Sequence, residues 1–292
     1  MNILAADIGG TTTKMAICHQ DGTLSDVMEY ATESMQGGPH VVERLLLHME
    51  QYKNYDAIAI STAGQVNVDE GTIVYANENI PNYTGTKLAE IVQARFGKPV
   101  KVENDVNAAA LGEARFGAAK AHKSFLCLTF GTGIGGAIVM NRKIYRGADG
   151  VAAEFGHMFT HAWNSSETSP RKSFYEHHAS TTALIRLAKE YDQQVVDGKQ
   201  LFGKIKNGDE KLKAVLNEWV NEVSVGLATL IHIFNPSAII VGGGVMEQDF
   251  LVRLVEQQTK QLIMPSYMGV CIRKAELGNK AGLIGAASHF FD

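Results

Sequence analysis

Residues 7–14 combine an acid, glycines, hydroxyls and a lysine, which are residue types suited to binding phosphate. The segment reads Asp7-Ile8-Gly9-Gly10-Thr11-Thr12-Thr13-Lys14. Backbone N–H groups of a glycine turn form an anion site, threonine hydroxyls donate to phosphate oxygens, and the lysine adds positive charge. Asp7 is placed to hold a magnesium ion through water. A plain hairpin, whose glycines only supply positive φ, explains the same residues equally well.

A second glycine cluster lies in the segment Thr129-Phe130-Gly131-Thr132-Gly133-Ile134-Gly135-Gly136. Its glycines satisfy the GxGxxG pattern of dinucleotide-binding proteins. That pattern must open a helix, whereas residues 137–140 are strand-like. We therefore expect this turn to join two strands as a second phosphate hairpin.

A third cluster, Gly242-Gly243-Gly244, follows an apolar strand pattern at 239–241 and precedes a helical pattern from Gln248. Close approach of the backbone to a flat ligand such as adenine is one explanation. An ordinary turn from strand to helix is the other.

Glu103-Asn104-Asp105 stands where a predicted strand ends and a predicted helix starts. Ligands bind at this position in α/β sheets, and a carboxylate there can accept a proton from a substrate hydroxyl. The alternative is structural, because Asn104 or Asp105 would also cap the helix without any chemistry.

Glu154-Phe155-Gly156-His157 and the later Glu176 supply carboxylate and imidazole groups that can bind the hydroxyls of a sugar. The histidines at 157, 161, 177 and 178 suggest a metal site, but none has HExxH or paired-cysteine spacing. A structural role is the default for each histidine taken alone.

The elements that position these residues follow one plan twice, a β-meander and then alternating strands and helices. Strands are predicted at 3–8, 11–18, 24–30, 57–61, 100–103, 125–130, within 137–145 and at 238–241. Helices are predicted at 41–52, 87–96, 106–116 and from 248. Residues 161–173 and 197–210 read as surface excursions. The recurrence suggests two related lobes with a cleft between them.

Composition and charge argue against a nucleic-acid-binding or membrane protein. The chain has 292 residues, 45% of them hydrophobic, and a net charge of −4. This is an ordinary globular composition with no surplus of positive charge for binding nucleic acid. Cys18, Cys127 and Cys271 lie far apart, so we expect them to be buried and reduced. With neither a signal peptide nor an apolar run of membrane-spanning length, we expect a cytoplasmic protein with no membrane partner.

In chain order, the motifs DIGGTTTK, END, FGTGIGGA, EFGH and VGGG resemble those of the ROK family of sugar kinases and sugar-responsive repressors. The resemblance spans nearly the whole chain. It implies an α/β, two-lobed actin-like ATPase (ribonuclease H-like) fold, in which each lobe is a mixed sheet flanked by helices. We expect one lobe at 1–117, to which a helix at about 280–292 returns, and the other at 118–279.

The resemblance also implies Mg²⁺ and ATP-dependent phosphorylation of a hexose, usually at the 6-hydroxyl, with Asp105 as the general base. The residues that it assigns to the sugar are Asn104, Glu154, His157 and Glu176, with Gly64 and Asn77 suggested by position alone. Those that it assigns to phosphate and magnesium are Asp7, Gly9, Gly10, Thr11, Thr12, Lys14, Gly131, Thr132 and Gly133. Gly243 and Gly244 would lie by the adenosine.

The chain departs from the family in one motif. Many members carry a CxCGxxGC zinc site after EFGH, whereas residues 163–173 contain no cysteine. Structural zinc is therefore not expected, and His157 keeps only a sugar-binding role.

Glucose or a β-glucoside such as cellobiose is the favoured acceptor. N-acetylmannosamine kinase and a catalytically weak sugar sensor are the alternatives. A repressor is disfavoured, because family repressors place a helix-turn-helix before the core, whereas the phosphate strand here begins at Ile3. A homodimer is expected from the frequency of dimers in the family.

Overall fold

Two compact units make up the computed structural model, which describes residues 1–164, 166 and 168–291. The first unit contains Met1–Ala121, Ile144–Ala152 and the C-terminal residues from Glu276. The second contains His122–Lys143 and Ala153–Ala275. Residues 144–152, which the sequence assigns to the second lobe, therefore pack with the first unit.

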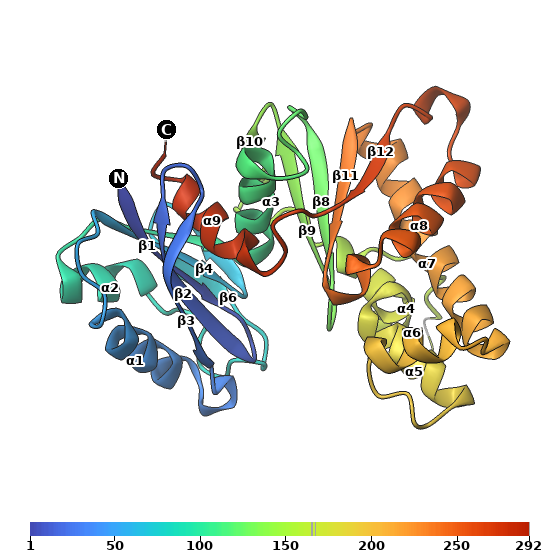
Figure 1. Cartoon of the computed structure of the whole chain (residues 1–292), viewed down its shortest axis with the longest axis horizontal. Helices are drawn as coiled ribbons and strands as arrows, with labels where there is room; N and C mark the ends of the chain where they lie inside the picture. Colours follow the sequence, from blue (N-terminus) through green and yellow to red (C-terminus); the bar gives the residue numbers. More distant parts are fainter. Residues whose placement is uncertain (165, 167, 292) are drawn as a thin grey trace. The chain divides into compact units, whose positions relative to one another are not determined.

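The first unit is built on a five-stranded mixed sheet (Figure 1). The strand order is β3 (Leu24–Ala31), β2 (Thr12–His19), β1 (Asn2–Ile8), β4 (Ala57–Thr62) and β7 (Val100–Asn104). The first three strands pair antiparallel, whereas β1, β4 and β7 run parallel. The carboxyl ends of the parallel strands thus meet at one edge, where α/β sheets bind ligands.

Helices cover both faces of this sheet, because alternate residues of each strand point to opposite sides. Leu4 and Ala6 belong to one core cluster with residues of α1 (Gly38–Met49) and α2 (Leu88–Phe96). Ile3 and Ala5 belong to another with residues of α3 (Asp105–Phe116) and α9 (Ala281–Ser288). The central strands β1 and β4 are largely apolar on both sides, as parallel strands buried on both faces require.

The second unit has its own five-stranded sheet, packed against a helical layer. The strand order is β10 (Lys143–Ile144), β9 (Ile134–Met140), β8 (Phe125–Phe130), β11 (Ala238–Gly242) and β12 (Cys271–Lys274). The helices are α4 (Tyr175–Ala179), α5 (Thr181–Tyr191), α6 (Gly198–Lys206), α7 (Glu210–Phe234) and α8 (Asp249–Leu262). Trp219 of α7 is fully buried in the core, and its indole N–H donates to the Ser180 carbonyl at 2.9 Å.

Short elements complete the chain. A small hairpin pairs β5 (Gln65–Asn67) with β6 (Thr72–Tyr75), where the sequence suggests only a loop. The 3-10 turns are η1 (Ser34–Gln36), η2 (Phe155–His157), η3 (Pro170–Ser173), η4 (Gly244–Glu247), η5 (Pro265–Tyr267) and η6 (Gly278–Lys280).

Most predicted elements are confirmed, including the meander, the mixed sheets flanked by helices and the strand-to-strand turn at 131–133. Residues 197–210, predicted as a surface excursion, are exposed or half-buried apart from Leu201, but they contain helix α6, which was not predicted. Asp197 accepts a hydrogen bond from the Gln200 backbone and caps α6, and Leu201 of this helix is fully buried. The expected burial of the cysteines holds for Cys18 and Cys127, whereas Cys271 is only half-buried.

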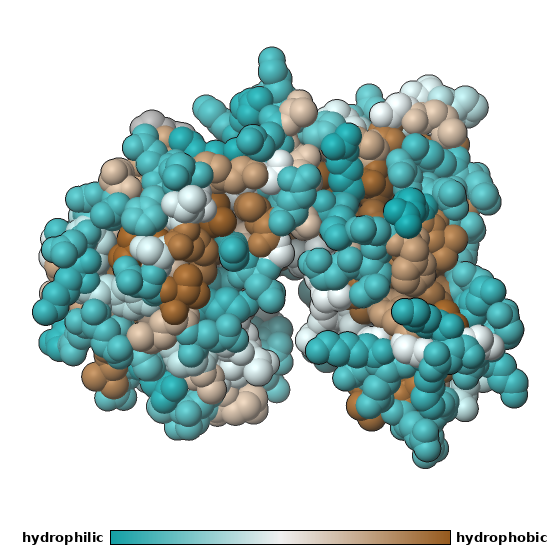
Figure 2. All heavy atoms as spheres, viewed as in Figure 1, coloured by the Kyte–Doolittle hydropathy of each residue, from teal (hydrophilic) through white to brown (hydrophobic). Residues whose placement is uncertain are grey.

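Most of the surface seen in Figure 2 is hydrophilic, with smaller hydrophobic areas. Within the described residues, no helix combines the length and the apolar character needed to cross a membrane.

Candidate active site

Three polar side chains stand in one row across the parallel strands of the first unit. Asp7 of β1 pairs in register with Ser61 of β4, and Ser61 pairs with Glu103 of β7. The Ser61 hydroxyl donates to Asp7 Oδ1 at 2.7 Å. The row lies near the carboxyl edge of the sheet, so the strand register alone assembles polar groups at the ligand-binding edge.

Asp105 begins α3 directly after β7, and its neighbour Asn104 holds it in place. Asn104 Oδ1 caps α3 by accepting from the backbone N–H groups of Val106 and Asn107. Its Nδ2 donates to Asp105 Oδ1 and to the Gly64 carbonyl, each at 2.9 Å. These four contacts use all the hydrogen-bonding positions of the Asn104 side chain. A sugar hydroxyl on Asn104 would have to replace one of them.

The environment of Asp105 suits a proton acceptor. Its Oδ1 also accepts from the Val106 backbone N–H at 2.9 Å, so two donors orient this oxygen. Burial, and to a lesser extent the charge of nearby Asp7, raise the pKa of Asp105 to about 6. A carboxyl group with a pKa near 6 is mostly deprotonated at neutral pH and is a stronger base than an ordinary aspartate.

Asp7 is the other carboxylate of this site. Burial raises the pKa of Asp7, and the Ser61 hydrogen bond and the charge of Lys14 oppose the rise. Lys14 is the register partner of Asp7 on β2. The two aspartates repel each other, and oxygen ligands with negative charge are those that Mg²⁺ prefers. The pair therefore fits a magnesium ion, which would relieve the repulsion.

The first glycine turn is rigidly held from within. The Gly9 N–H donates to the Thr12 carbonyl at 3.1 Å, and the Gly9 carbonyl accepts from the Thr32 hydroxyl at 2.7 Å. Thr13 is buried and hydrogen-bonded to Thr32, so its hydroxyl is committed to the fold. Gly10 and Thr11 are exposed, which leaves them available to a ligand.

Glu103 forms a buried ion cluster that sequence reasoning missed. Its side chain is 1% exposed and accepts from Arg146 Nη1 at 3.0 Å, Arg146 Nη2 at 2.5 Å and His289 Nε2 at 3.0 Å. Burial opposes the charge of Glu103, but the hydrogen bonds from His289 and Arg146 outweigh it and lower the pKa to about 2. The motif END includes Glu103, but nothing in the neighbouring sequence predicts that Arg146 and His289 are its partners.

Gly64 and Asn77 belong to the segment around the small hairpin. Gly64 has φ +97°, and a Cβ there would lie 2.7 Å from the Tyr75 carbonyl oxygen, so the backbone geometry already requires glycine. Asn77 is exposed, and its Oδ1 accepts from the Asn79 backbone N–H at 3.1 Å. Through the Asn104 contact, Gly64 is linked to Asp105, whereas no contact with that group is found for Asn77 in the described chain.

In the second unit, Glu176 lies against the second glycine turn. Its Oε2 accepts from the Ile134 backbone N–H at 3.3 Å, and a Cβ at Gly133 would collide with the same oxygen. Thr181, at the start of α5, donates from its backbone to the Gly131 carbonyl at 3.0 Å. The turn at 131–133 is thus held by two helices, with Thr132 at its tip.

Glu154 and His157 form a second polar pair in this unit. His157 Nδ1 lies 3.6 Å from Glu154 Oε2, and both side chains are about half exposed. The His157 ring meets Phe174 edge to face, with ring centroids 5.1 Å apart. Carboxylate and imidazole groups are of the kind that bind hydroxyl groups.

Gly243 and Gly244 follow β11 and have different surroundings. Gly243 has φ +103°, and a Cβ there would collide with the backbone of Phe130 at the end of β8. A Cβ at Gly244 would meet nothing within 4 Å. Packing therefore explains the first glycine and leaves space at the second.

The chain is similar to known proteins over almost its entire length. The sequence profile of the ROK family matches residues 3–292. A β-glucoside kinase of Klebsiella pneumoniae is 33% identical over 99% of this chain and 96% of its own length. Among solved structures, a ROK family glucokinase from Streptomyces griseus in complex with glucose and AMPPNP has a TM-score of 0.85 and 29% identity, covering 99% of both chains. Lmo2764 of Listeria monocytogenes, described as a candidate N-acetylmannosamine kinase, has a TM-score of 0.90 and 29% identity, covering 99% of this chain and 98% of its own.

Proposed function

Because the chain belongs to the ROK family, we propose that it transfers the γ-phosphate of ATP to the 6-hydroxyl of a hexose, with Asp105 as the general base. The family match, together with relatives named as sugar kinases, identifies the chain as a carbohydrate kinase with an actin-like ATPase fold. The single observation that carries the finer proposal is the Asp105 carboxylate, which is half-buried, oriented through Oδ1 and given a pKa of about 6.

In the proposed reaction, the deprotonated Asp105 accepts the proton of the 6-hydroxyl as the oxygen bonds to the γ-phosphorus and ADP leaves. Positioning and electrostatic stabilisation supply most of the rate in phosphoryl transfer, and a general base adds about 10²–10⁴-fold. Bound magnesium would neutralise charge on the phosphates. Asp7, oriented by the Ser61 hydroxyl, is the residue that we propose to hold it through water.

The glycine turns at residues 9–12 and 131–133 are proposed to bind the phosphates, together with Lys14 and Thr132. Gly244 is proposed to lie by the adenosine. Gly243 is proposed to fix the backbone conformation that places Gly244 there. Open space supports this division, because a Cβ at Gly10, Gly131 or Gly244 would meet nothing within 4 Å.

The Gly131→Ala and Gly243→Ala variants should separate binding from folding. We expect Gly131→Ala to leave the melting temperature nearly unchanged and to raise the KM for ATP about tenfold, because its methyl group enters open space intended for phosphate. Gly243→Ala should lower the melting temperature by several degrees, because it forces a left-handed backbone and a collision with Phe130. Thermal unfolding and ATP titration of both variants check this, and an unchanged KM in Gly131→Ala would remove that turn from the phosphate site.

For the sugar, we propose glucose or a β-glucoside, in line with the names of the relatives. Glu154, His157 and Glu176 are proposed to bind its hydroxyls, with Gly64 and Asn77 near the sugar. An N-acetylmannosamine acceptor is the second candidate, and the observation that favours it is the similarity to Lmo2764.

Glucose and 6-deoxyglucose compared as acceptors test the proposed position of transfer. The two sugars differ only in the hydroxyl that receives the phosphate. We expect glucose to drive ADP release and 6-deoxyglucose to bind without turnover. Equal turnover with both would show that another hydroxyl, or water, is the acceptor.

The rate should depend on pH through Asp105. Its carboxylate is the active form, so kcat/KM for the sugar should fall about tenfold per pH unit below a pKa of about 6 and level off above it. Initial rates at saturating Mg·ATP between pH 5 and pH 8 measure this. A rate that stays constant down to pH 5 would contradict the assignment of Asp105 as base.

A further inference from the structure

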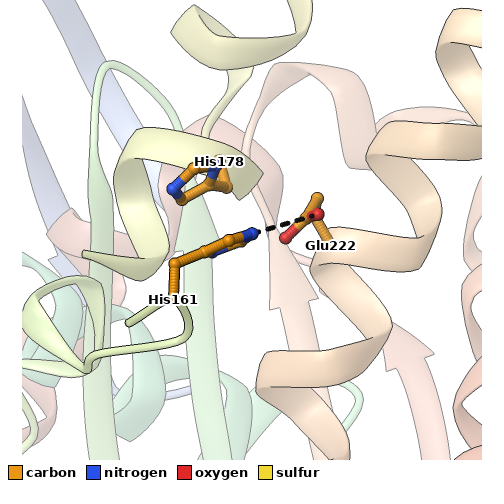
Figure 3. Close-up of side chains that lie close together, drawn as sticks. All are labelled: His161, His178 and Glu222. Atoms are coloured by element: carbon orange, nitrogen blue, oxygen red, sulfur yellow. Dashed lines mark ion pairs between the residues drawn. The ribbon is translucent and has the colours of Figure 1, made fainter. Parts of the chain in front are cut away.

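Three side chains far apart in the sequence converge in the second unit (Figure 3). His161 follows η2, His178 lies on α4 and Glu222 lies on α7, and one potential ligand atom of each lies within 4.8 Å of the other two. His161 Nε2 is 3.7 Å from Glu222 Oε1. The two imidazole rings stack, with centroids 3.7 Å apart. Two imidazoles and a carboxylate are a ligand set used by zinc enzymes.

One hydrogen bond fixes the protonated nitrogen of His178. His178 Nε2 lies 2.6 Å from the Lys172 carbonyl oxygen, which can only accept, so Nε2 carries the proton. Nδ1 of His178 therefore keeps its lone pair for a ligand. A backbone carbonyl that fixes the tautomer in this way is the usual support of a metal-binding histidine.

We propose that His161, His178 and Glu222 bind one divalent transition-metal ion of the zinc type, with water as the fourth ligand. Tetrahedral zinc with bonds of about 2.0–2.1 Å places its ligand atoms about 3.3 Å apart. The His161 and His178 rings are stacked here, so His161 must rotate out of the stack before the in-plane lone pairs of both rings can point at one ion. Side-chain rotation can supply this movement, because His161 is 42% exposed and projects from a loop.

This site is distinct from the cysteine motif that the sequence lacks, since it draws on none of residues 163–173 and not on His157. With both histidines neutral, the three ligands carry one negative charge. The charge of Arg186 acts on His178, and that of Lys172 acts on the adjacent His177; Arg186 also donates to the His177 carbonyl at 2.7 Å. These positive charges repel a metal ion, so we expect the site to bind it with moderate affinity.

A bound ion would connect the loop that follows η2 and helix α4 to α7. Glu176 lies on α4 as well, and its Oε2 accepts from Ile134 at the second glycine turn. The ion would therefore restrict the helix that carries a proposed sugar ligand. This consequence rests on the proposed function, whereas binding of the metal does not.

Titration of the metal-free full chain with Zn²⁺ in a calorimeter, without sugar or ATP, tests the proposal. We expect one equivalent to bind with a Kd of about 10 μM or below. His161→Gln and Glu222→Gln should each weaken binding at least tenfold. The matched control is His177→Gln, an adjacent histidine outside the cluster, which should bind as the wild type does. Co²⁺ in place of zinc should give the intense visible absorption of a four-coordinate site in the wild type and the control.

Absence of saturable zinc binding, or equal affinity in His161→Gln and His177→Gln, would overturn the proposal. Cobalt spectra of six-coordinate type in the wild type would also overturn it. Because no step of the experiment requires phosphoryl transfer, its failure and a failure of the proposed kinase reaction are distinguishable. Circular dichroism of each variant establishes that it is folded before titration.

Discussion

Asp105→Asn should reduce kcat by about 10²–10⁴-fold while the protein remains folded and binds sugar. Asparagine has the same shape, and its oxygen can still accept the hydrogen bonds from Asn104 and Val106 that orient the native side chain. It cannot take a proton from a hydroxyl. The loss should therefore appear in kcat more than in the KM for sugar.

The same variant should be more stable than the wild type at neutral pH. The pKa of Asp105 rises from 3.8 to about 6 on folding, so the unfolded chain gives up this proton first. The charged carboxylate consequently destabilises the folded state as pH rises through this window, by an amount on the order of 1–3 kcal/mol above pH 6. Removing the charge should recover that stability.

The exposed Asp69→Asn substitution in the same unit is the control, for which neither rate nor stability should change. Urea unfolding at pH 7 without magnesium, together with steady-state rates, measures both effects. A rate near that of the wild type, or an unfolded variant, would contradict the role of Asp105.

Glu103→Gln should lower the free energy of unfolding at pH 7 by about 3 kcal/mol or more, the largest effect on stability that we expect. Glu103 is buried, its charge is matched by the Arg146 guanidinium, and His289 donates a hydrogen bond to it. A neutral amide leaves the arginine without its counter-charge in a site with little water. The exposed pair of Lys87 and Glu90 provides the control, and Glu90→Gln should cost less than about 1 kcal/mol.

The stabilisation that Glu103 provides to the folded state should be lost at acid pH. Its pKa falls from 4.5 to about 2 on folding, so the stabilisation is complete above pH 4.5 and is lost as the pH falls toward 2. Urea unfolding of Glu103→Gln and of the wild type should accordingly give a constant difference between pH 6 and pH 8, and a smaller one below pH 4.5. A difference that does not change with acid would mean that packing, not charge, explains the loss.

The parts of the site that could be predicted are those that depend on residues close together in the sequence. A strand, two glycines and hydroxyls define the turn at residues 9–12, and a strand-to-helix junction defines the position of Asp105. The hydrogen bond from Asn104 to the Gly64 carbonyl could not be predicted, because the two residues are 40 positions apart in the sequence.

Long-range partners explain the rest of what was missed. Arg146 and His289 are separated from Glu103 by 43 and 186 residues, and only the folded first unit brings them together. The convergence of His161, His178 and Glu222 likewise depends on how α4 packs against α7. Helix α6 was missed because its lysines and glycines obscure the single stripe that buries Leu201.

The most direct test of the central claim is ADP release with Mg·ATP across glucose, cellobiose, fructose, N-acetylglucosamine and N-acetylmannosamine, with Asp105→Asn as the blank. We predict high turnover with glucose or cellobiose in the wild type and at least a hundredfold lower turnover in the variant. A folded, ATP-binding wild type that turns over none of the sugars, or a variant as fast as the wild type, would contradict this account.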